Sequence, residues 1–360
     1  MPVARRTAAA VALVLAAAGC TADERRGDGS PALDTSDLVG TVDLDDAVGS
    51  DVVLYDLASA PDGTPVALLG APDSPQSWLV ELTVGEAGPT AVGVRAVPAV
   101  SATAQLVVAP DGTVLVADDA LLTLPPRAAE PTAIPWQGGR PDAAALTTDG
   151  RTLYAARGPA ITAVDVATGA VTGTGTAPAP VTHLAPTPDG GLAALVAAPR
   201  PAGGTGAELV TLDAALRPVG EPVELVRERE STGTGLQVTA DGTAVAAVHL
   251  GESRATGRLV SVVDGALRTS ADLEGAGDTA LDLVVSPDGR LASVPLADLS
   301  YPAELVTIDL ASGERVGAVK LCDGTGVFGA VTPLGQDGDV VVTGACIDGD
   351  GPRSTAFVVG

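Results

Sequence analysis

Lysine is almost absent from this sequence. Lys320 is the only one among 360 residues, and 20 basic residues in total stand against 45 acidic ones. The resulting net charge of −25 argues strongly against a nucleic-acid partner, because binding to phosphate backbones needs clustered Lys and Arg. It also argues against adhesion to anionic lipid headgroups through a basic surface. We therefore expect no nucleic acid among the partners of this protein.

Histidine and aromatic residues are also scarce. His183 and His249 are the only histidines, which excludes a multi-histidine site of the kind that holds catalytic zinc. The sequence contains no phosphate-binding loop ending in Gly-Lys, no His-Glu-x-x-His and no Gly-x-Ser-x-Gly. Aromatic residues make up 2% of the chain, so few rings are available to stack against sugars. These absences leave no familiar catalytic signature and no expected cofactor.

Weak calcium binding is the one metal alternative that the acidic residues suggest. Asp43, Asp45 and Asp46 form one cluster, and the Asp-Gly-Asp-Gly segment at 348–351 resembles a fragment of an EF-hand loop. A proline follows this segment directly, and the bidentate glutamate that ends an EF-hand loop is missing. We interpret both groups as solvated turns and keep weak calcium binding as the alternative.

The apolar run near the start of the chain is too short to span a membrane. Arg5 and Arg6 precede small apolar residues from Thr7 to Ala18, which is the anatomy of an export signal. The run ends in Ala-Ala-Gly-Cys, which resembles a bacterial lipobox with alanine at the position where leucine is usual. The resemblance implies cleavage after residue 19 and a diacylated Cys20. An ordinary secretory signal with an incidental cysteine is the alternative.

The segment after Cys20 is polar and has no periodicity, which is typical of a flexible tether. We therefore predict a lipoprotein signal peptide at 1–19, a tether at 20–37 and a folded domain at 38–360. Membrane attachment is expected through the lipid anchor only, on the extracytoplasmic face of the cell membrane. The domain itself is expected to be monomeric.

An Asp-Gly turn recurs seven times, each between two strand-like runs. The seven turns are Asp62-Gly63, Asp111-Gly112, Asp149-Gly150, Asp189-Gly190, Asp241-Gly242, Asp288-Gly289 and Asp337-Gly338. Their mean spacing is about 46 residues, in the range of one four-stranded propeller blade. Asp-Gly suits a tight hairpin because glycine accepts the positive φ that a two-residue connection demands.

A second turn, Asp-x-x-Thr/Ser-Gly, appears at 165–169 and 309–313, and a proline precedes the first turn in four copies. These blades resemble the YVTN and WD-repeat-like families of bacterial β-propellers. The resemblance implies an all-β fold over 38–360, a seven-bladed β-propeller of four-stranded antiparallel blades. It implies little about activity.

The last blade is one strand short. After the seventh Asp-Gly turn we find strands only at 340–344 and 355–359. The strand-like run 38–44 precedes the first complete blade, so we predict that it fills the outer position of blade 7 and closes the ring. An open ring would leave a row of unpaired backbone groups on the last sheet.

Cys322 and Cys346 remain as a pair once Cys20 is assigned to lipid. The first follows the outermost strand of blade 6, and the second follows the second strand of blade 7. Both strands finish on the same face of a propeller, so we predict a disulfide, with two free buried thiols as the alternative.

The candidate ligand face is built by the loops that enter each blade and the loops after each second strand. Trp, Tyr and Arg carry most recognition energy in binding sites. The candidates on this face are Trp136, Arg140, Arg157, His183, Arg227, Arg229, His249, Glu252, Arg254 and Tyr301. The Asp-Gly turns lie on the opposite face and are interpreted as structural.

The favoured function is a binding or scaffolding module for a protein or small ligand at the cell surface. The alternative is a propeller-fold enzyme, lactonase- or lyase-like, with His183 or His249 as general base at the channel mouth. An enzyme needs several converging ionisable groups, and two histidines make that alternative weaker. Convergence of both histidines with Glu252 would favour it.

Overall fold

The structure of the protein is a computed structural model. It describes residues 37–71, 74–85, 88–128, 130–136, 139–201, 203–228, 230–251, 257–273, 279–280, 282–297, 303–335, 338–348 and 351–360. The chain divides into two units, Met1–Ser30 and Pro31–Gly360, and every described residue belongs to the second.

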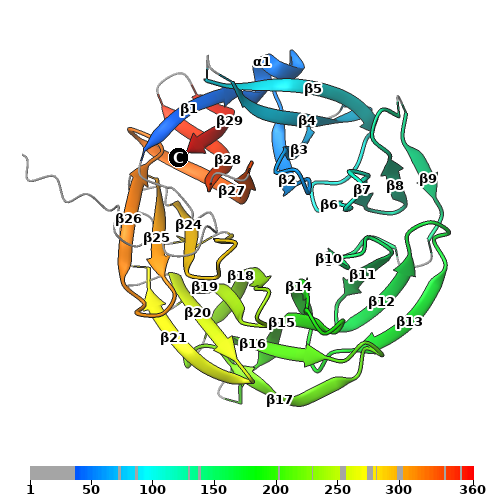
Figure 1. The fold of residues 1–360 in the computed structure, drawn as a ribbon, viewed down its shortest axis with the longest axis vertical. Helices are drawn as coiled ribbons and strands as arrows, with labels where there is room; N and C mark the ends of the chain where they lie inside the picture. Colours follow the sequence, from blue (N-terminus) through cyan, green and yellow to red (C-terminus); the bar gives the residue numbers. More distant parts are fainter. Residues whose placement is uncertain are drawn as a thin grey trace, which may run out of the picture. The chain divides into compact units, whose positions relative to one another are not determined.

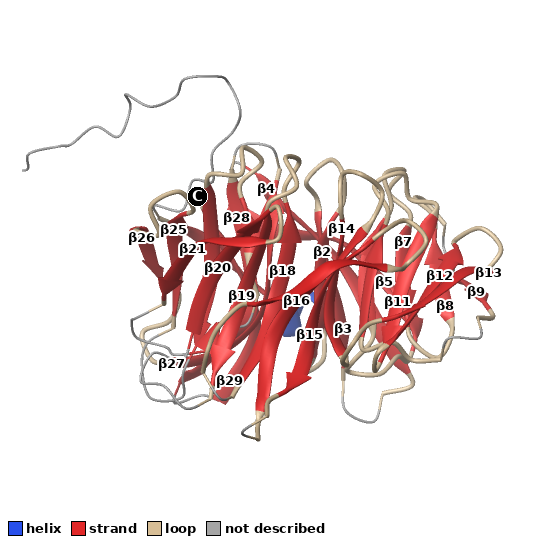
Figure 2. Ribbon diagram, turned by 90° about the horizontal axis from the view of Figure 1, so that it is seen from below, coloured by secondary structure: helices blue, strands red, loops and turns tan. Residues whose placement is uncertain are grey.

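The second unit is a seven-bladed β-propeller, as the repeats predict. Its described strands form seven antiparallel sheets arranged as blades around a central axis (Figure 1). In blades 1 to 6 the strands follow one another in chain order from the axis outward. Figure 2 shows the blades edge-on, with loops gathered at two opposite faces.

The first four blades are continuous in sequence. Blades 1 and 2 contain β2 (Val53–Ser59), β3 (Pro65–Gly70), β4 (Gln76–Gly85) and β5 (Gly88–Pro98), then β6 (Gln105–Val108), β7 (Val114–Ala117), β8 (Leu121–Leu124) and β9 (Thr132–Ile134). Blades 3 and 4 contain β10 (Ala143–Leu146), β11 (Thr152–Arg157), β12 (Ala160–Asp165) and β13 (Val171–Thr176), then β14 (Val181–Pro186), β15 (Leu192–Pro199), β16 (Thr205–Leu212) and β17 (Pro218–Glu224).

The last three blades include the ring closure. Blade 5 contains β18 (Ser231–Val238), β19 (Ala244–Leu250), β20 (Gly257–Val263) and β21 (Ala266–Asp272). In blade 6, β22 (Thr279–Ala280) and β23 (Val284–Val285) share the innermost position, followed by β24 (Leu291–Ala297), β25 (Glu304–Asp309) and β26 (Arg315–Lys320). Blade 7 contains β27 (Thr325–Leu334), β28 (Asp339–Asp348), β29 (Gly351–Val359) and β1 (Leu38–Asp43).

The core is divided among the blade junctions. The buried apolar residues that the structure describes form seven clusters, one between each pair of neighbouring blades. Middle strands are covered on both faces, as in β3, where all six residues are buried. Alanine, valine and leucine fill most of these layers. A chain with 2% aromatic residues therefore still builds a full core.

The described Asp-Gly turns of blades 1 to 6 join the first and second strands, and they are longer than the predicted two-residue connection. They have three residues in blades 1, 2, 4 and 5 and four residues in blades 3 and 6. In blade 1, the Gly63 amide donates to the Ala60 carbonyl and the Ala60 amide donates to the Thr64 carbonyl, both at 2.8 Å. Gly63 has φ +82°, whereas Asp62 is not among the positive-φ residues. This is a three-residue connection with a left-handed glycine in its last position, which also suits the strand twist.

The ring closes as predicted, through the start of the chain. β1 pairs antiparallel with β29, so it takes the outer position of blade 7. Asp37 and Gly360 exchange two backbone hydrogen bonds, of 2.9 and 3.0 Å, at the end of this pairing. Leu44 was expected to end the strand. It instead begins the short helix α1 (Leu44–Val48), and its side chain is fully buried in the cluster between blades 7 and 1.

The predicted disulfide between Cys322 and Cys346 is present, with 5.8 Å between the two Cα atoms. Cys322 follows β26 as expected, but Cys346 lies within β28 because this strand continues to Asp348 instead of ending at 344. The bridge links blade 6 to blade 7, which is the blade that both ends of the domain complete. On the chain-entropy model, closing a loop of this size contributes roughly 3–4 kcal/mol.

No helix in the described part of the chain is long and apolar enough to cross a membrane. The one helix it contains has five residues.

Candidate functional site

A cavity of about 860 Å³ lies at the centre of the ring, and we call it the central cavity. All seven blades contribute to its wall, six through their innermost strands and blade 6 through the residues between β22 and β23. Its lining also includes Thr148, Pro188 and Ala240, which belong to Asp-Gly turns. The cavity therefore extends to the Asp-Gly face of the propeller, opposite to the face on which the sequence suggested a ligand.

The wall of the central cavity combines small apolar side chains with a few polar groups. Leucine, valine, alanine and proline make up most of the lining. The polar groups are two carboxyls, Asp56 and Asp282, two amides, Gln105 and Gln237, and several threonine hydroxyls. The described lining contains no lysine, arginine, histidine or aromatic residue. Asp56 and Asp282, the channel aspartates, are thus its only titratable groups.

Asp56 lies at a β-bulge in β2 and joins blade 1 to blade 2. Its Oδ1 accepts a hydrogen bond of 2.8 Å from the Leu57 amide, and its Oδ2 accepts one of 2.7 Å from the Leu106 amide in β6. A bulge leaves one residue unpaired and re-aims the side chain beside it. Here the Asp56 carboxyl becomes the hydrogen-bond acceptor for the Leu106 amide of the neighbouring blade.

Asp282 does the same between blades 6 and 7. Its Oδ1 accepts a hydrogen bond of 2.8 Å from the Leu283 amide, and its Oδ2 accepts one of 3.0 Å from the Val331 amide in β27. The two channel aspartates thus lie on blades 1 and 6, on either side of blade 7. Among the described residues, no lysine, arginine or histidine pairs with either carboxyl.

Both side chains are half-buried, and the loss of water around them makes the carboxyls hard to ionise. Desolvation raises the pKa of Asp56 to about 6, although the Leu106 and Leu57 amides oppose the shift. Desolvation, together with the charge of Asp56, raises the pKa of Asp282 to about 7 against the Val331 and Leu283 amides. Near neutral pH, the cavity therefore holds two carboxyls close to the midpoint of their titration.

Other polar side chains make comparable links between blades. Gln237 Oε1 in blade 5 accepts a hydrogen bond of 2.8 Å from the Val285 amide in blade 6. His183 in blade 4 makes a hydrogen bond with the Thr234 backbone in blade 5. The Val285 amide thus obtains its acceptor from the preceding blade, as those of Leu106 and Val331 do. The hydrogen bond of His183 runs the other way, because it raises the imidazole pKa as a bond to a carbonyl oxygen does.

His183 and His249, the two predicted candidates for a general base, are both enclosed. Burial lowers the pKa of His183 to about 4, with the Thr234 backbone opposing the shift. The Nδ1 atoms of His183 and His249 are buried, and neither has a hydrogen-bond partner among the residues that the structure describes. Glu252, the third member of the arrangement that would favour an enzyme, lies outside the described residues. The enzyme alternative therefore stays a prediction.

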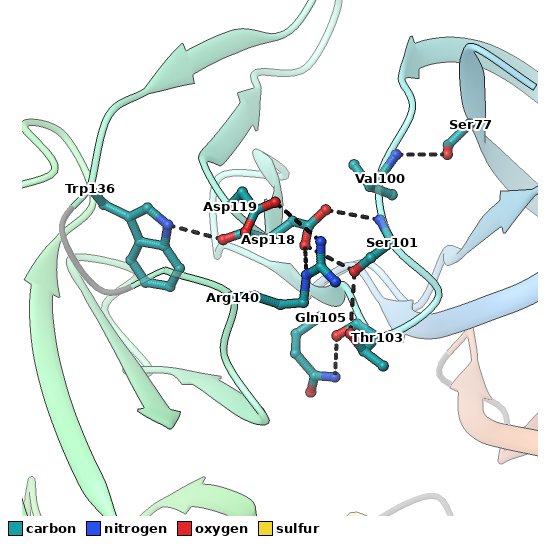
Figure 3. Close-up of polar contacts among 9 residues, drawn as sticks. All are labelled: Ser77, Val100, Ser101, Thr103, Gln105, Asp118, Asp119, Trp136 and Arg140. Atoms are coloured by element: carbon teal, nitrogen blue, oxygen red, sulfur yellow. Dashed lines mark hydrogen bonds and ion pairs between the residues drawn. The ribbon is translucent and has the colours of Figure 1, made fainter. Parts of the chain in front are cut away.

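Trp136 is not presented to a ligand, contrary to expectation. Its side chain is buried in the cluster between blades 2 and 3, and its indole N–H donates a hydrogen bond of 3.0 Å to the Asp118 carbonyl (Figure 3). The indole N–H needs a partner once the ring is buried, and the loop after β7 supplies it.

Arg140 is held in an ion-pair network rather than left available. Its Nε contacts Asp118 Oδ1 at 2.8 Å and its Nη2 contacts Asp119 Oδ2 at 3.1 Å (Figure 3). Asp118 also accepts hydrogen bonds from the amide and hydroxyl of Ser101. Burial alone would raise the pKa of Asp118, but the hydrogen bonds from Ser101 and Arg140 leave it lowered. This network joins the loops around blade 2.

Arg157 and Arg227 are exposed, as expected for the predicted face. Arg157 ends β11 and lines a small cavity of about 200 Å³ together with Gly139. Among the described residues, no ion pair involves Arg157 or Arg227. Four further sites from the sequence lie outside the described residues: Arg229, Arg254, Tyr301 and the predicted lipidation site Cys20. None of the predicted ligand-face residues that the structure describes lines the central cavity.

The channel aspartates were missed from the sequence, although a signal for them exists. Asp56 and Asp282 each lie six residues before the aspartate of their blade's Asp-Gly turn. The same position holds Gln105 in blade 2 and His183 in blade 4. An alignment of the first strands on their Asp-Gly turns would therefore have put Asp56, Gln105, His183 and Asp282 at one shared position. Three of these residues line the cavity, and His183 contacts the next blade.

The acidic cluster considered for calcium is engaged in local structure. Asp43 caps α1 by accepting a hydrogen bond of 3.0 Å from the Asp46 amide. Asp45 accepts hydrogen bonds from the Val52 and Ser354 amides. Within the described ranges, no group of three His, Cys, Asp or Glu residues could hold a metal ion. Weak calcium binding stays a prediction.

No family model matches this chain. No curated protein matches it either. Among solved structures, the chain is similar to hydrazine synthase of Kuenenia stuttgartiensis, with a TM-score of 0.61 and 16% sequence identity. The similarity covers 80% of this chain and 92% of the other. At this identity the likeness supports the propeller fold alone.

Proposed function

We propose that this protein is a lipid-anchored, extracytoplasmic β-propeller that binds a small ligand in its central cavity. The observation that carries the proposal is a cavity of about 860 Å³ walled by every blade of the ring. That volume lies in the range of small-molecule sites, which are mostly apolar with a few placed polar groups.

The wall is built to keep its shape. Seven apolar junctions, the pairing of β1 with β29 and the Cys322–Cys346 bridge all resist opening of the ring. Polar side chains such as Asp56 and Asp282 tie neighbouring innermost strands to each other. A preformed cavity spares a ligand the entropy of ordering its own site, which favours binding.

Ligand occupancy has a direct test. The protein, purified from its native host under mild conditions, should release a small molecule that native mass spectrometry detects. Thr148 is exposed at the mouth of the cavity, so Thr148→Trp should narrow the mouth without disturbing the core. The matched control is Thr174→Trp, at an exposed position on the outer strand β13 of the same blade.

We expect the adduct on the wild type and on Thr174→Trp, and its loss from Thr148→Trp. An adduct retained at the same level by Thr148→Trp would place binding elsewhere and contradict the proposal. Absence of any adduct from the native protein, together with no thermal stabilisation by a small-molecule library, would contradict it as well.

The anchor is tested separately. Replacing the predicted lipidation site, Cys20→Ala, should abolish labelling by a radioactive fatty acid and release the protein into the medium. Unchanged membrane attachment of this variant would overturn the location that we propose and leave the cavity proposal standing.

A further inference from the structure

The channel aspartates are half-buried and lack the positive partner that carboxylates withdrawn from water usually have. Each accepts two backbone hydrogen bonds, and no basic residue in the described part of the chain contacts it. A charge that has lost part of its water is costly unless it is paired, so an ionised Asp56 or Asp282 would be stabilised by any cation that enters the cavity. The lining offers no such cation of its own.

The mouth of the cavity is negative too. Asp149, Asp189 and Asp241, which we call the rim aspartates, are neighbours in sequence of the lining residues Thr148, Pro188 and Ala240. Hydrogen bonds from nearby threonine side chains come first among the causes that lower the pKa of each rim aspartate. The rim is therefore ionised at neutral pH and attracts cations towards the opening.

The size and chemistry of the wall favour an organic cation over a metal ion. A cavity of about 860 Å³ is far larger than one ion, and no described group of three acidic, histidine or cysteine residues could hold a metal. Leu57, Leu106 and Leu184 contribute apolar surface between the polar groups. Such a wall suits an aliphatic body, and the two carboxyls suit two ammonium groups.

Resting on the proposed function, we infer that the ligand of the central cavity is an aliphatic diamine or polyamine whose ammonium groups pair with Asp56 and Asp282. The cavity then selects for positive charge by supplying two carboxyls without a counter-charge. The apolar wall discriminates against small hydrated metal ions.

Binding is then coupled to protonation. An ammonium group beside Asp56 or Asp282 favours the ionised carboxyl, so binding near neutral pH expels protons from the cavity. The rim aspartates are already ionised and release none. Proton release therefore separates binding at the channel aspartates from loose association with the rim.

The probe is putrescine, measured by isothermal titration calorimetry with the folded mature protein. Titrations at pH 6.5 in two buffers of different ionisation enthalpy give the number of protons released. We expect release of at least half a proton per ligand, and an affinity that rises at least tenfold from pH 5 to pH 8. A pH-independent affinity without proton release would overturn the inference.

Three other compounds test whether the positive charges of putrescine are what the cavity recognises. n-Butylamine carries one ammonium group and should bind more weakly than putrescine, whereas 1,4-butanediol carries none and should not bind. Calcium chloride tests a metal alone and should not compete with putrescine. Equal binding of the diol, or displacement of putrescine by millimolar calcium, would contradict the inference.

The variant test uses Asp56→Asn/Asp282→Asn, with Asp149→Asn at the rim as its matched control. Putrescine affinity should fall at least tenfold in the double variant and less than threefold in the control. If the double variant does not fold, proton release by the wild type decides the question alone. If a neutral ligand occupies the cavity and putrescine does not bind, the inference fails and the proposed function stands.

Discussion

The rim and the wall of the central cavity use aspartate in opposite ways. The rim aspartate Asp149 accepts hydrogen bonds from the Thr147 hydroxyl and the Arg151 amide, both within its own turn. The channel aspartate Asp282 accepts one from the Val331 amide, 49 residues away in the next blade. The pKa of Asp149 is lowered, whereas that of Asp282 is raised to about 7.

The difference shows what burial does to one side chain. Water and local donors stabilise the carboxylate at the rim, so ionisation there costs nothing extra. In the wall, the backbone donors do not make up for the water that is lost. Rim aspartates stabilise a turn. Each channel aspartate links two blades, and its own carboxyl is near the midpoint of its titration at neutral pH.

The largest expected effect is a difference in the free energy of unfolding between a variant of a channel aspartate and a variant of a rim aspartate. At pH 5, Asp282→Ala leaves the Leu283 and Val331 amides without acceptors and should lower the free energy of unfolding by about 3 kcal/mol. The same change at Asp149 should cost much less, because water can replace its partners. Urea unfolding of both variants checks this, and similar losses would erase the distinction between rim and wall.

A smaller effect concerns the pH dependence of stability. A carboxyl whose pKa is raised by folding stabilises the protein most below its unfolded pKa, and that contribution is lost as pH rises through the folded value. Relative to Asp282→Asn, the wild type should therefore lose about 2–3 kcal/mol between pH 5 and pH 8, given a folded pKa of about 7. Chemical unfolding at several pH values measures it.

Asp149→Asn is the rim control for this series. Its pH dependence between pH 5 and pH 8 should match that of the wild type, because the pKa of Asp149 is lowered and its titration lies below this range. If the free energy of unfolding changes with pH in the same way for the wild type and for Asp282→Asn, the Asp282 carboxyl ionises as easily as the rim carboxyls do, which would contradict the prediction.

The smallest effect has the opposite sign and comes from His183. Folding lowers its pKa to about 4, so the unfolded chain takes up a proton first as the pH falls. Relative to His183→Gln, the wild type should lose about 2 kcal/mol between pH 7 and pH 5. Parallel curves for the two proteins would contradict the burial of this imidazole.

The fold could be predicted because its signals are local and repeated. Asp-Gly turns such as Asp62-Gly63 need a left-handed glycine. Their spacing matches the length of one blade, and their number predicts the number of blades. The missing strand of blade 7 then required the pairing of β1 with β29. The turn length was predicted wrongly, because the same dipeptide occurs in connections of two, three and four residues. The two-residue form occurs at Asp264-Gly265, where both residues have positive φ.

The site was harder to predict because it depends on how deeply each side chain is buried and on which residues it contacts. Trp136 and Arg140 belong to the expected loops, yet one is buried and the other ion-paired through Asp118. Position in a loop does not reveal such partners, which come from another blade. Asp56 and Asp282 looked like ordinary polar residues on inner strands, and only their shared register to the Asp-Gly turns marks them.

The protonation of the channel aspartates is measured most directly by NMR. The protein is labelled with ¹³C at the aspartate carboxyl carbon, and Asp56→Asn and Asp282→Asn identify the two resonances. We predict titration midpoints near pH 6 for Asp56 and near pH 7 for Asp282, with the rim aspartates titrating below the ordinary value of 3.8. If both channel resonances titrate below pH 5 with the others, the carboxyls of the cavity are ordinary solvated acids and the wall does not hold them near their titration midpoints at neutral pH.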